Sequence, residues 1–487
     1  RWVARADRVK RSAAGRGRRV RRRDLRAGSA AGASLPLAGC DDYGAANMPR
    51  PPEPKAGPDG QRLLPWQNWS GYQSSLPSQR IAPETETALA ELLTSTAGTV
   101  RPVGSGHSFT PLVPTDDTIV SLRHFSGLLE HDTAAMTAVV GAGTKLGSLG
   151  APLHDAGQAL INMPDVDAQT LAGSMATATH GTGAGLGALH TAATGFRLVT
   201  PTGEIIDCSA GENPDVFQAA QVSLGALGVI TRVTLQNVPT VRMKRRVWVE
   251  DFAALVERFD TLAAEHHSFE MYCVPHCDYG IGITIDPTDD AIQPRGPEQD
   301  NDAVMDLKKL RDLLSWFPAA RRWLLNMAMQ DYEPEEAVDV WYRIFPSSRA
   351  VRFNEMEYHL PREALLPTLL EVRKTLEQKH PGVFFPMEIR LVKGDDAWLS
   401  PFQGHATSGS IAVHRYFEED PLPLFRDVEP LYQPLGGRPH WGKMHTLGPA
   451  TLAERYPRFG DFVALQARLD PDGRMLNDYL KGLLDHA

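Results

Sequence analysis

A histidine in a glycine-rich loop is the first side chain of this sequence whose type and setting could carry chemistry. It belongs to the run Gly104-Ser105-Gly106-His107-Ser108, which follows a predicted strand. Glycines permit positive φ angles and let successive backbone N–H groups point at one spot, so such a loop can hold a phosphate. A neutral imidazole nitrogen is also nucleophilic near pH 7. The run alone equally fits a solvent-facing loop, because its spacing differs from the Gly-x-Gly-x-x-Gly dinucleotide fingerprint.

A second run, over residues 170–183, consists mostly of small residues with interleaved hydroxyls. It contains Ser174, Thr177, His180 and Gly183. Side chains this small cannot fill a core at the density of protein interiors. Either the run is a structural glycine-rich loop, or a flat molecule such as a cofactor packs against its backbone.

Glu388 and Arg390 lie two residues apart in a predicted strand and therefore point to the same face of a sheet. Such a pair is most often a surface ion pair of little energetic value. The apolar neighbours Phe385, Met387 and Ile389 indicate burial instead. A buried acid and base on one strand face could bind a polar substrate.

A short loop near the C-terminus, Arg438-Pro-His440-Trp441-Gly442-Lys443, carries three further groups that have little use in a core. Lys443 could supply a positive charge where negative charge develops in a reaction, and such electrostatic stabilisation is often worth a few kcal/mol, about 3. His440 could support Lys443 or contact a substrate.

Strands and helices alternate irregularly around these groups, which predicts an α+β fold rather than a doubly wound nucleotide fold. Apolar periodicity predicts helices over residues 85–94, 146–156, 215–223, 252–264 and 311–329. Strands are expected over residues 99–103, 118–122, 138–140, 197–199, 228–236, 241–249, 353–358, 384–391 and 410–416. Residues 286–304 are acidic and rich in proline, and we expect a surface loop there.

Together these runs resemble the vanillyl-alcohol oxidase superfamily, in particular its sugar branch of aldonolactone oxidoreductases and alditol oxidases. The Asn68-Trp69-Ser70-Gly71 run, the segment Ser223–Ile230 and the tail Leu469–Gly473 are similar to family motifs as well. The resemblance implies a two-subdomain FAD-binding domain and an antiparallel-sheet substrate cap. By the resemblance, the segments are a signal over residues 1–40, a linker over 41–65, the FAD-binding domain over 66–239, the cap over 240–430, and a return to the flavin over 431–487.

The resemblance also assigns the cofactor contacts. His107 would bond covalently to the C8α methyl of FAD. Four loop residues would line the pyrophosphate: Gly104, Ser105, Gly106 and Ser108. Ser174, Thr177, His180 and Gly183 would lie along the cofactor, and Ile230 would contact its adenine end through the backbone.

In the cap, the resemblance implies that Glu388 and Arg390 face the flavin and hold a sugar. His414 would belong to the same pocket, and Lys443 would lie near flavin N1, where it stabilises the reduced form. The base that takes the hydroxyl proton would be Glu388 or His414. Glu355 and Glu357 match a family strand, and we expect them to act as scaffolding for Arg390.

The expected reaction is FAD-dependent oxidation of a D-arabinono-, L-gulono- or L-galactono-1,4-lactone, with hydride transfer to flavin N5. An alditol oxidase acting on xylitol or sorbitol is the main alternative. A non-catalytic carbohydrate-binding lipoprotein predicts the loss of Glu388, Arg390 or Lys443, and all three are present. The electron acceptor would be O2, a quinone or a cytochrome.

The N-terminal segment is predicted to be a targeting signal. Residues 1–26 carry twelve Lys or Arg against two Asp, so the rest of a chain with net charge −9 is acidic, which argues against nucleic acid. Arg22-Arg23 forms a twin-arginine pattern, and Leu37–Cys40 resembles a lipobox. We expect export to the periplasm or cell surface, with membrane attachment only through Cys40. Cys273 and Cys277 could form a disulfide; with His276 they lack the second ligand pair of a zinc site, so no metal is expected.

Overall fold

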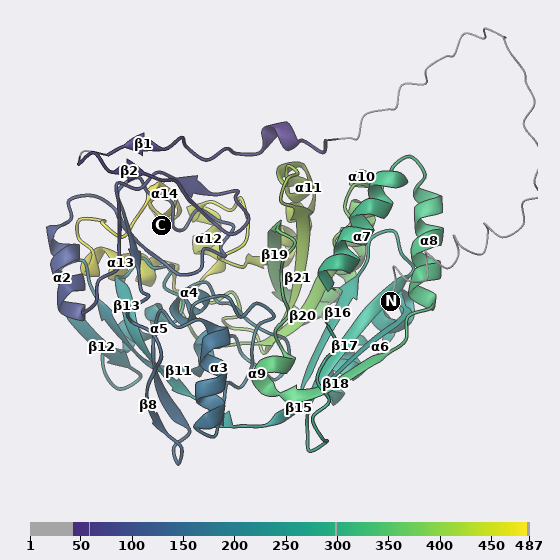
Figure 1. The fold of residues 1–487 in the computed structure, drawn as a ribbon, viewed down its shortest axis with the longest axis horizontal. Helices are drawn as coiled ribbons and strands as arrows, with labels where there is room; N and C mark the ends of the chain where they lie inside the picture. Colours follow the sequence, from purple (N-terminus) through teal and green to yellow (C-terminus); the bar gives the residue numbers. More distant parts are fainter. Residues whose placement is uncertain (1–41, 58, 298–299, 485–487) are drawn as a thin grey trace, which may run out of the picture. The chain divides into compact units, whose positions relative to one another are not determined.

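The computed structural model describes residues 42–57, 59–297 and 300–484. The twin-arginine pattern and Cys40 lie outside the described residues. The first described segment, residues 42–75, runs over the surface as mostly irregular chain (Figure 1). It contains only short elements: η1 (Ala45–Asn47), β1 (Lys55–Ala56), β2 (Arg62–Leu63), β3 (Trp66–Gln67) and β4 (Ser74–Ser75).

Two sheets form the first half of the fold. A three-stranded parallel sheet has the order β5-β7-β6, and a five-stranded antiparallel sheet has the order β12-β11-β13-β9-β8. A pair of two-residue strands, β10 and β14, closes one edge of this half. The strands are β5 (Gln79–Ile81), β6 (Val100–Val103), β7 (Thr118–Ser121), β8 (Leu128–Asp132), β9 (Thr137–Gly141), β10 (Gln158–Ala159), β11 (Ala193–Val199), β12 (Ile205–Ser209), β13 (Val229–Gln236) and β14 (Val238–Pro239).

Helices cover these sheets through apolar residues at helical spacing. In α2, Thr85 caps the N-terminus by accepting a hydrogen bond from Ala88 N–H, and Leu89 and Leu93 are buried four residues apart. The helical elements of this half are α2 (Glu86–Ser95), α3 (Leu146–Asp155), α4 (Leu171–Met175), η2 (Leu189–Ala192) and α5 (Pro214–Ala220).

The second half is built on one antiparallel sheet of eight strands, with the order β18-β15-β17-β16-β20-β21-β19-β22. Strands β19, β20 and β21 lie next to the first half (Figure 1). The strands are β15 (Arg242–Asp251), β16 (Ser268–Cys273), β17 (Tyr279–Thr288), β18 (Glu335–Val340), β19 (Phe353–Pro361), β20 (Met387–Lys393), β21 (Thr407–Tyr416) and β22 (Arg438–Pro439). The helical elements are α6 (Phe252–Glu265), α7 (Asp300–Leu313), α8 (Pro318–Gln330), α9 (Trp341–Ile344), η3 (Arg362–Ala364), α10 (Leu365–Lys379), α11 (Leu422–Tyr432) and η4 (Gln433–Leu435).

The chain finally returns to the first half through α12 (Pro449–Arg455), α13 (Phe459–Leu469) and α14 (Asp478–Leu484), which Figure 1 draws in yellow beside the blue elements. The buried Arg101 on β6 joins the two ends, because its guanidinium donates to Leu112 O at 2.7 Å and Leu224 O at 2.8 Å and also to Met475 O. Burial lowers the pKa of Arg101 to about 9, and these carbonyls replace its water shell. The architecture confirms the α+β prediction.

Two sequence predictions in the cap are wrong. One helix was expected over residues 311–329, but the chain forms α7 and α8 with a turn between them. Pro318 explains the break, because proline suits the first position of a new helix and cannot continue an old one. The expected loop over 286–304 also ends early, since α7 begins at Asp300.

Cys273 and Cys277 are buried free thiols and do not form the disulfide that the sequence allowed. Burial raises the pKa of Cys273 to about 12, so it behaves as a small apolar side chain. Among the described residues, no helix combines the length and the apolar character needed to cross a membrane.

Candidate active site

A large cleft lies between the glycine-rich loops of the first half and the β19–β21 face of the cap. Its empty volume is about 1440 Å³, open solvent included. Every site residue predicted from the sequence lines this cleft, with one exception. Those residues are Gly104, Ser105, Gly106, His107, Ser108, Ser174, Thr177, His180, Ile230, Glu388, Arg390, His414, His440 and Lys443.

Gly183 is the exception, because it does not line the cleft, and its contact with the cofactor stays a prediction. Its N–H donates to Leu391 O at 2.8 Å, so it fastens the small-residue run to β20. With φ at +150°, an added Cβ would lie 2.6 Å from Leu186 Cδ1 and 2.9 Å from His267 O. A glycine is required there by backbone geometry and packing.

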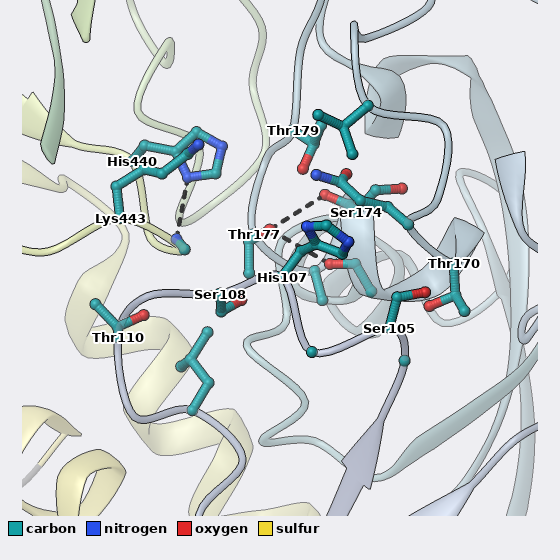
Figure 2. Close-up of a pocket in the computed structure, with 18 of the residues that line it drawn as sticks. Ser105, His107, Ser108, Thr110, Thr170, Ser174, Thr177, Thr179, His440 and Lys443 are labelled. Atoms are coloured by element: carbon teal, nitrogen blue, oxygen red, sulfur yellow. Dashed lines mark hydrogen bonds between the residues drawn. The ribbon is translucent and has the colours of Figure 1, made fainter. Parts of the chain in front are cut away.

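The two small-residue runs pack against each other and form one wall of the cleft. A Cβ on Gly104 would lie 2.2 Å from Thr170 Oγ1, and Gly106 has φ +69°, so neither position accepts a larger residue without displacement. Figure 2 shows Ser105, His107 and Ser108 across from Thr170, Ser174 and Thr177. This bare backbone and its hydroxyls fit a long, polar, partly flat ligand, as FAD is.

The His107 side chain projects from this wall. The ring stacks on Trp69 with centroids 5.2 Å apart, and no hydrogen bond to it is present within the described residues. Burial lowers the pKa of His107 to about 4, helped by the positive charges of Lys443 and Lys145. The imidazole is therefore neutral at ordinary pH, and its nitrogen lone pair can attack carbon.

The C-terminal loop is tied directly to the His107 loop, although more than 300 residues separate them in sequence. Phe109 N–H donates to Gly442 O at 2.7 Å, and Thr110 Oγ1 donates to Trp441 O at 2.7 Å. Gly442 N–H in turn donates to His440 Nδ1 at 3.0 Å, which fixes the acceptor nitrogen of that ring. Burial lowers the pKa of His440 to about 3, with Lys443 also contributing, so the ring is neutral. His440 thus supports the loop that carries Lys443.

The strand register of the cap places the acids and bases on one face. Glu355 lies directly opposite His414 across the β19–β21 ladder. Glu388 is opposite Ala412 on β21 and Tyr272 on β16, and Arg390 is opposite Ser410. Because side chains alternate faces along each strand, Glu388 and Arg390 project from the same face, and Glu355, Glu388, Arg390 and His414 all line the cleft.

Lys443, Glu355 and His414 form a buried polar group. The Lys443 ammonium donates to Glu355, and His414 Nε2 lies 3.6 Å from Glu355 Oε1 and 4.0 Å from Glu388 Oε1. Burial alone would raise the pKa of Glu355, but its polar neighbours, above all the positive charge of Lys443, outweigh burial and lower the pKa to about 2. His414 Nδ1 lies 3.1 Å from Pro386 O, so that nitrogen carries the proton and Nε2 is the nitrogen that can accept another.

Arg390 sits in a second group, which the sequence only partly revealed. Its guanidinium contacts Glu388 at 2.7 Å and Glu270 at 2.9 Å and also donates to Asp165. Arg349 reaches the same Asp165 at 3.3 Å. The expectation that Glu355 and Glu357 support Arg390 is therefore wrong, because Arg390 is held by acids from other elements.

Three carboxylates and two guanidiniums leave this group one negative charge in excess if all are ionised. Burial of negative charge is costly. Despite burial, the charges of Arg390 and Arg349, with Arg245 and Arg295, lower the pKa of Asp165. Burial, with the neighbouring charge of Asp165, raises the pKa of Glu270 to about 7 despite the contact with Arg390. The Arg390 group can therefore change its charge near neutral pH.

Glu357 has a separate role beneath the small-residue run. It accepts a hydrogen bond from His180 Nε2 at 2.8 Å and another from Ser410 Oγ, and His180 Nδ1 lies 2.7 Å from Gly181 O. Ligand atoms of His180, Glu357 and His359 come within 4.8 Å of one another. His180 and Ser410 already hydrogen-bond to Glu357. The His180–Glu357 contact is therefore a buried ion pair that anchors the small-residue run to β19.

Sequence reasoning missed Asp165, Glu270, Tyr272 and Arg349, which surround Arg390. Glu270 had a usable signal, because it lies between Phe269 and Met271 as Glu388 lies between Met387 and Ile389. Asp165 and Arg349 lie in irregular segments, where only the fold brings them to Arg390.

Comparisons with known proteins agree with this geometry. A family model described as D-arabinono-1,4-lactone oxidase matches residues 233–483, and an FAD binding domain model matches residues 77–209. The chain is 36% identical over 430 residues to L-gulono-1,4-lactone dehydrogenase of Mycobacterium tuberculosis, covering 86% of this chain and 99% of the relative. It is 29% identical to L-gulonolactone oxidase of Bos taurus, with 87% and 98% covered. It is 30% identical to alditol oxidase of a Streptomyces species, with 86% and 98% covered.

Among solved structures, cholesterol oxidase from Brevibacterium sterolicum has the same fold, with a TM-score of 0.71 at 16% identity over 89% of this chain and 99% of that one. Fold and site together define an FAD-linked oxidoreductase of the vanillyl-alcohol oxidase type. The chain belongs to the aldonolactone oxidase family.

Proposed function

We propose that this enzyme oxidises the hydroxyl of an aldono-1,4-lactone of the D-arabinono, L-gulono or L-galactono type. The observation that carries the proposal is the wall formed by Arg390, Glu388, His414 and Lys443, which faces His107 across one cleft. A lactone offers several hydroxyls and two ester oxygens at fixed positions. Such a ligand suits a rigid wall that holds both a planar donor fork and carboxylate acceptors.

FAD, when bound, supplies the two-electron acceptor for the hydride that leaves the hydroxyl-bearing carbon. Glu388 accepts hydrogen bonds from substrate hydroxyls while Arg390 donates to the reacting oxygen. His414 Nε2 takes the hydroxyl proton, and Glu355 and Glu388, at 3.6 and 4.0 Å, stabilise the imidazolium that results. Glu388 is the weaker candidate for the base, because Arg390 already engages its carboxylate at 2.7 Å.

Covalent attachment of FAD through His107 is part of the proposal. Three observations support it. The ring nitrogens of His107 have no hydrogen-bond partner among the described residues, and the pKa of His107 is lowered. The neighbouring loop positions have space only for glycine. Lys443 contributes a fixed positive charge to the same region, as its effect on the pKa of His107 indicates.

Export and lipid attachment at Cys40 remain predictions from the sequence. A membrane-attached enzyme would have ready access to a quinone or cytochrome, whereas O2 needs no attachment. The acceptor is therefore tested together with the substrate.

An alditol oxidase is the second candidate, favoured by the 30% identity to the Streptomyces alditol oxidase over nearly the whole of that protein. An acyclic polyol could use the same Glu388 and Arg390 contacts, since it offers hydroxyls at similar spacing.

Anaerobic mixing of the purified enzyme with L-gulono-1,4-lactone, and separately with xylitol, distinguishes the two. The loss of the visible absorbance of oxidised flavin with the lactone, faster than with xylitol, is the expected result. Rapid bleaching by xylitol alone would favour the alditol oxidase. Reoxidation on admitting air identifies O2 as the acceptor, and reoxidation only by a quinone analogue identifies a dehydrogenase.

A further inference from the structure

The turn between α7 and α8 exposes an unusual number of large apolar side chains. Leu313 is 77% exposed, Trp316 68%, Phe317 65%, Trp323 61% and Met327 48%. Single exposed apolar residues are ordinary on protein surfaces, but five large ones within residues 313–327 of one hairpin indicate an interaction surface. We call these five residues the hairpin patch.

The patch follows one side of the hairpin. Trp323 and Met327 lie four residues apart on α8, so they share a face that continues from the turn. The opposite side of α8 is anchored in the cap through Arg321, Leu325 and Met329, which are buried. The aromatic side chains therefore face outward because the other side of the same helix is already packed.

The two helices are held firmly near the turn that joins them. Arg311 on α7 donates to Gly382 O at 2.7 Å and to Glu419 at 2.7 Å, and Arg321 donates to Pro381 O at 2.7 Å. These buried contacts fix the two helices on the cap, and Figure 1 places the pair at the outer edge of the cap, on the side away from the first half.

The described chain also begins at this place. The Tyr43 ring lies 4.4 Å from the Arg311 guanidinium and 5.1 Å from that of Arg415. Arg311 is two residues before Leu313, so the first described residues contact α7 next to the turn that carries the hairpin patch. Cys40 is only three residues before Tyr43 in the sequence.

We propose that the hairpin patch is a membrane-docking surface, which inserts Trp316, Phe317 and Trp323 into the headgroup region of a lipid bilayer. Tryptophan is enriched at membrane–water interfaces, because its large ring is apolar and its N–H remains hydrated. The chain from Ser315 to Gln330 contains no Asp or Glu, so no acidic side chain within it opposes insertion. Lipid attachment at Cys40, predicted from the sequence, would supply a second membrane signal beside the patch's own apolar contacts.

Flotation of the full-length Cys40→Ser flavoenzyme with phosphatidylcholine vesicles tests the docking surface without a lipid anchor. Neutral vesicles are needed because the twelve Lys and Arg within residues 1–26 would bind anionic lipid by themselves. We expect the protein to float with the vesicles. Adding Trp316→Ser, Phe317→Ser and Trp323→Ser should weaken partitioning at least tenfold, with flavin content and soluble-acceptor activity unchanged.

A matched control replaces three exposed apolar residues elsewhere, Leu129→Ser, Ile205→Ser and Leu435→Ser, and should float like the parent. Brominated phosphatidylcholine should quench tryptophan emission of the parent more than that of Trp316→Phe/Trp323→Phe. Absence of flotation of the Cys40→Ser parent, or equal flotation of the triple-serine variant, overturns the proposal. A dimer that dissociates on the serine substitutions without vesicle binding overturns it as well, and assigns the patch to a second copy.

Discussion

Glu355 and His414 are direct partners across the β19–β21 ladder, and the same carboxylate accepts the ammonium of Lys443. One buried acid therefore joins the group proposed to take the substrate proton to the group that supplies positive charge. Because Glu355 is only 4% exposed, removal of the Lys443 ammonium would leave its carboxylate poorly compensated.

Replacement of Lys443 by Met should both slow and destabilise the enzyme. The rate of flavin reduction should fall about 10²–10³-fold, as when a preorganised charge is removed from an active site. Glu355 would be left as a buried carboxylate without its main partner, at a cost of about 3–5 kcal/mol. Stopped-flow reduction and thermal denaturation measure the two effects.

The double variant Lys443→Met/Glu355→Gln should regain most of the lost stability but not the rate, because it removes the uncompensated charge without restoring the cation. Lys309→Met is the matched control, since Lys309 is exposed and its ion pair with Asp306 lies on the surface of α7. Equal stability of the single and double variants would show that Lys443 and Glu355 are not coupled.

Substitution of His107 by Ala should convert bound FAD from covalent to dissociable. After acid precipitation, nearly all flavin should appear in the supernatant, whereas the parent should retain it in the pellet. The exposed His124→Ala serves as the control. Flavin that stays in the pellet of His107→Ala would place the linkage on another residue.

Local pattern predicted the parts of the site that depend on one segment, and it failed where several segments meet. The loop around His107 and the shared face of Glu388 and Arg390 follow from glycine chemistry and strand alternation. The contact of Arg390 with Asp165 joins residues 225 positions apart, and no local signal could predict it. Tertiary packing determines such pairs. A buried guanidinium is costly unless acids pair with it, and the fold determines which acids lie near Arg390.

The same limit explains the wrong partner predicted for Glu355 and Glu357. Both acids were correctly expected on one strand face, but their neighbours are set by the sheet order. Strand β21 lies between β19 and β20. Glu355 on β19 is therefore paired with His414 on β21, and this strand separates it from Arg390 on β20.

Replacement of Arg390 by Lys should raise KM far more than it lowers kcat. The guanidinium contacts Asp165, Glu270 and Glu388 from one plane, and a lysine ammonium cannot reproduce that fork. We expect kcat/KM to fall about 100-fold, which corresponds to roughly 2.7 kcal/mol. Arg246→Lys, at an exposed ion pair of the same sheet, should leave both constants unchanged. An unchanged KM for Arg390→Lys would remove Arg390 from substrate binding.

Glu270 should make the enzyme less stable as the pH rises towards 8. Its pKa is raised from 4.5 to about 7 in the folded protein, so between these values the folded state holds a proton that the unfolded state has lost. Stability from this group is therefore fully present below pH 4.5 and is lost as the pH rises through 7. The shift corresponds to an upper limit of about 3 kcal/mol.

A Glu270→Gln substitution removes this titration while the amide oxygen still accepts from Arg390. Relative to the parent, its Tm should rise by several degrees at pH 8 and change little at pH 5. Thermal denaturation across that range, with the exposed Glu257→Gln as control, measures the difference. A parallel pH dependence in the parent and Glu270→Gln would mean that another member of the Arg390 group takes up the proton.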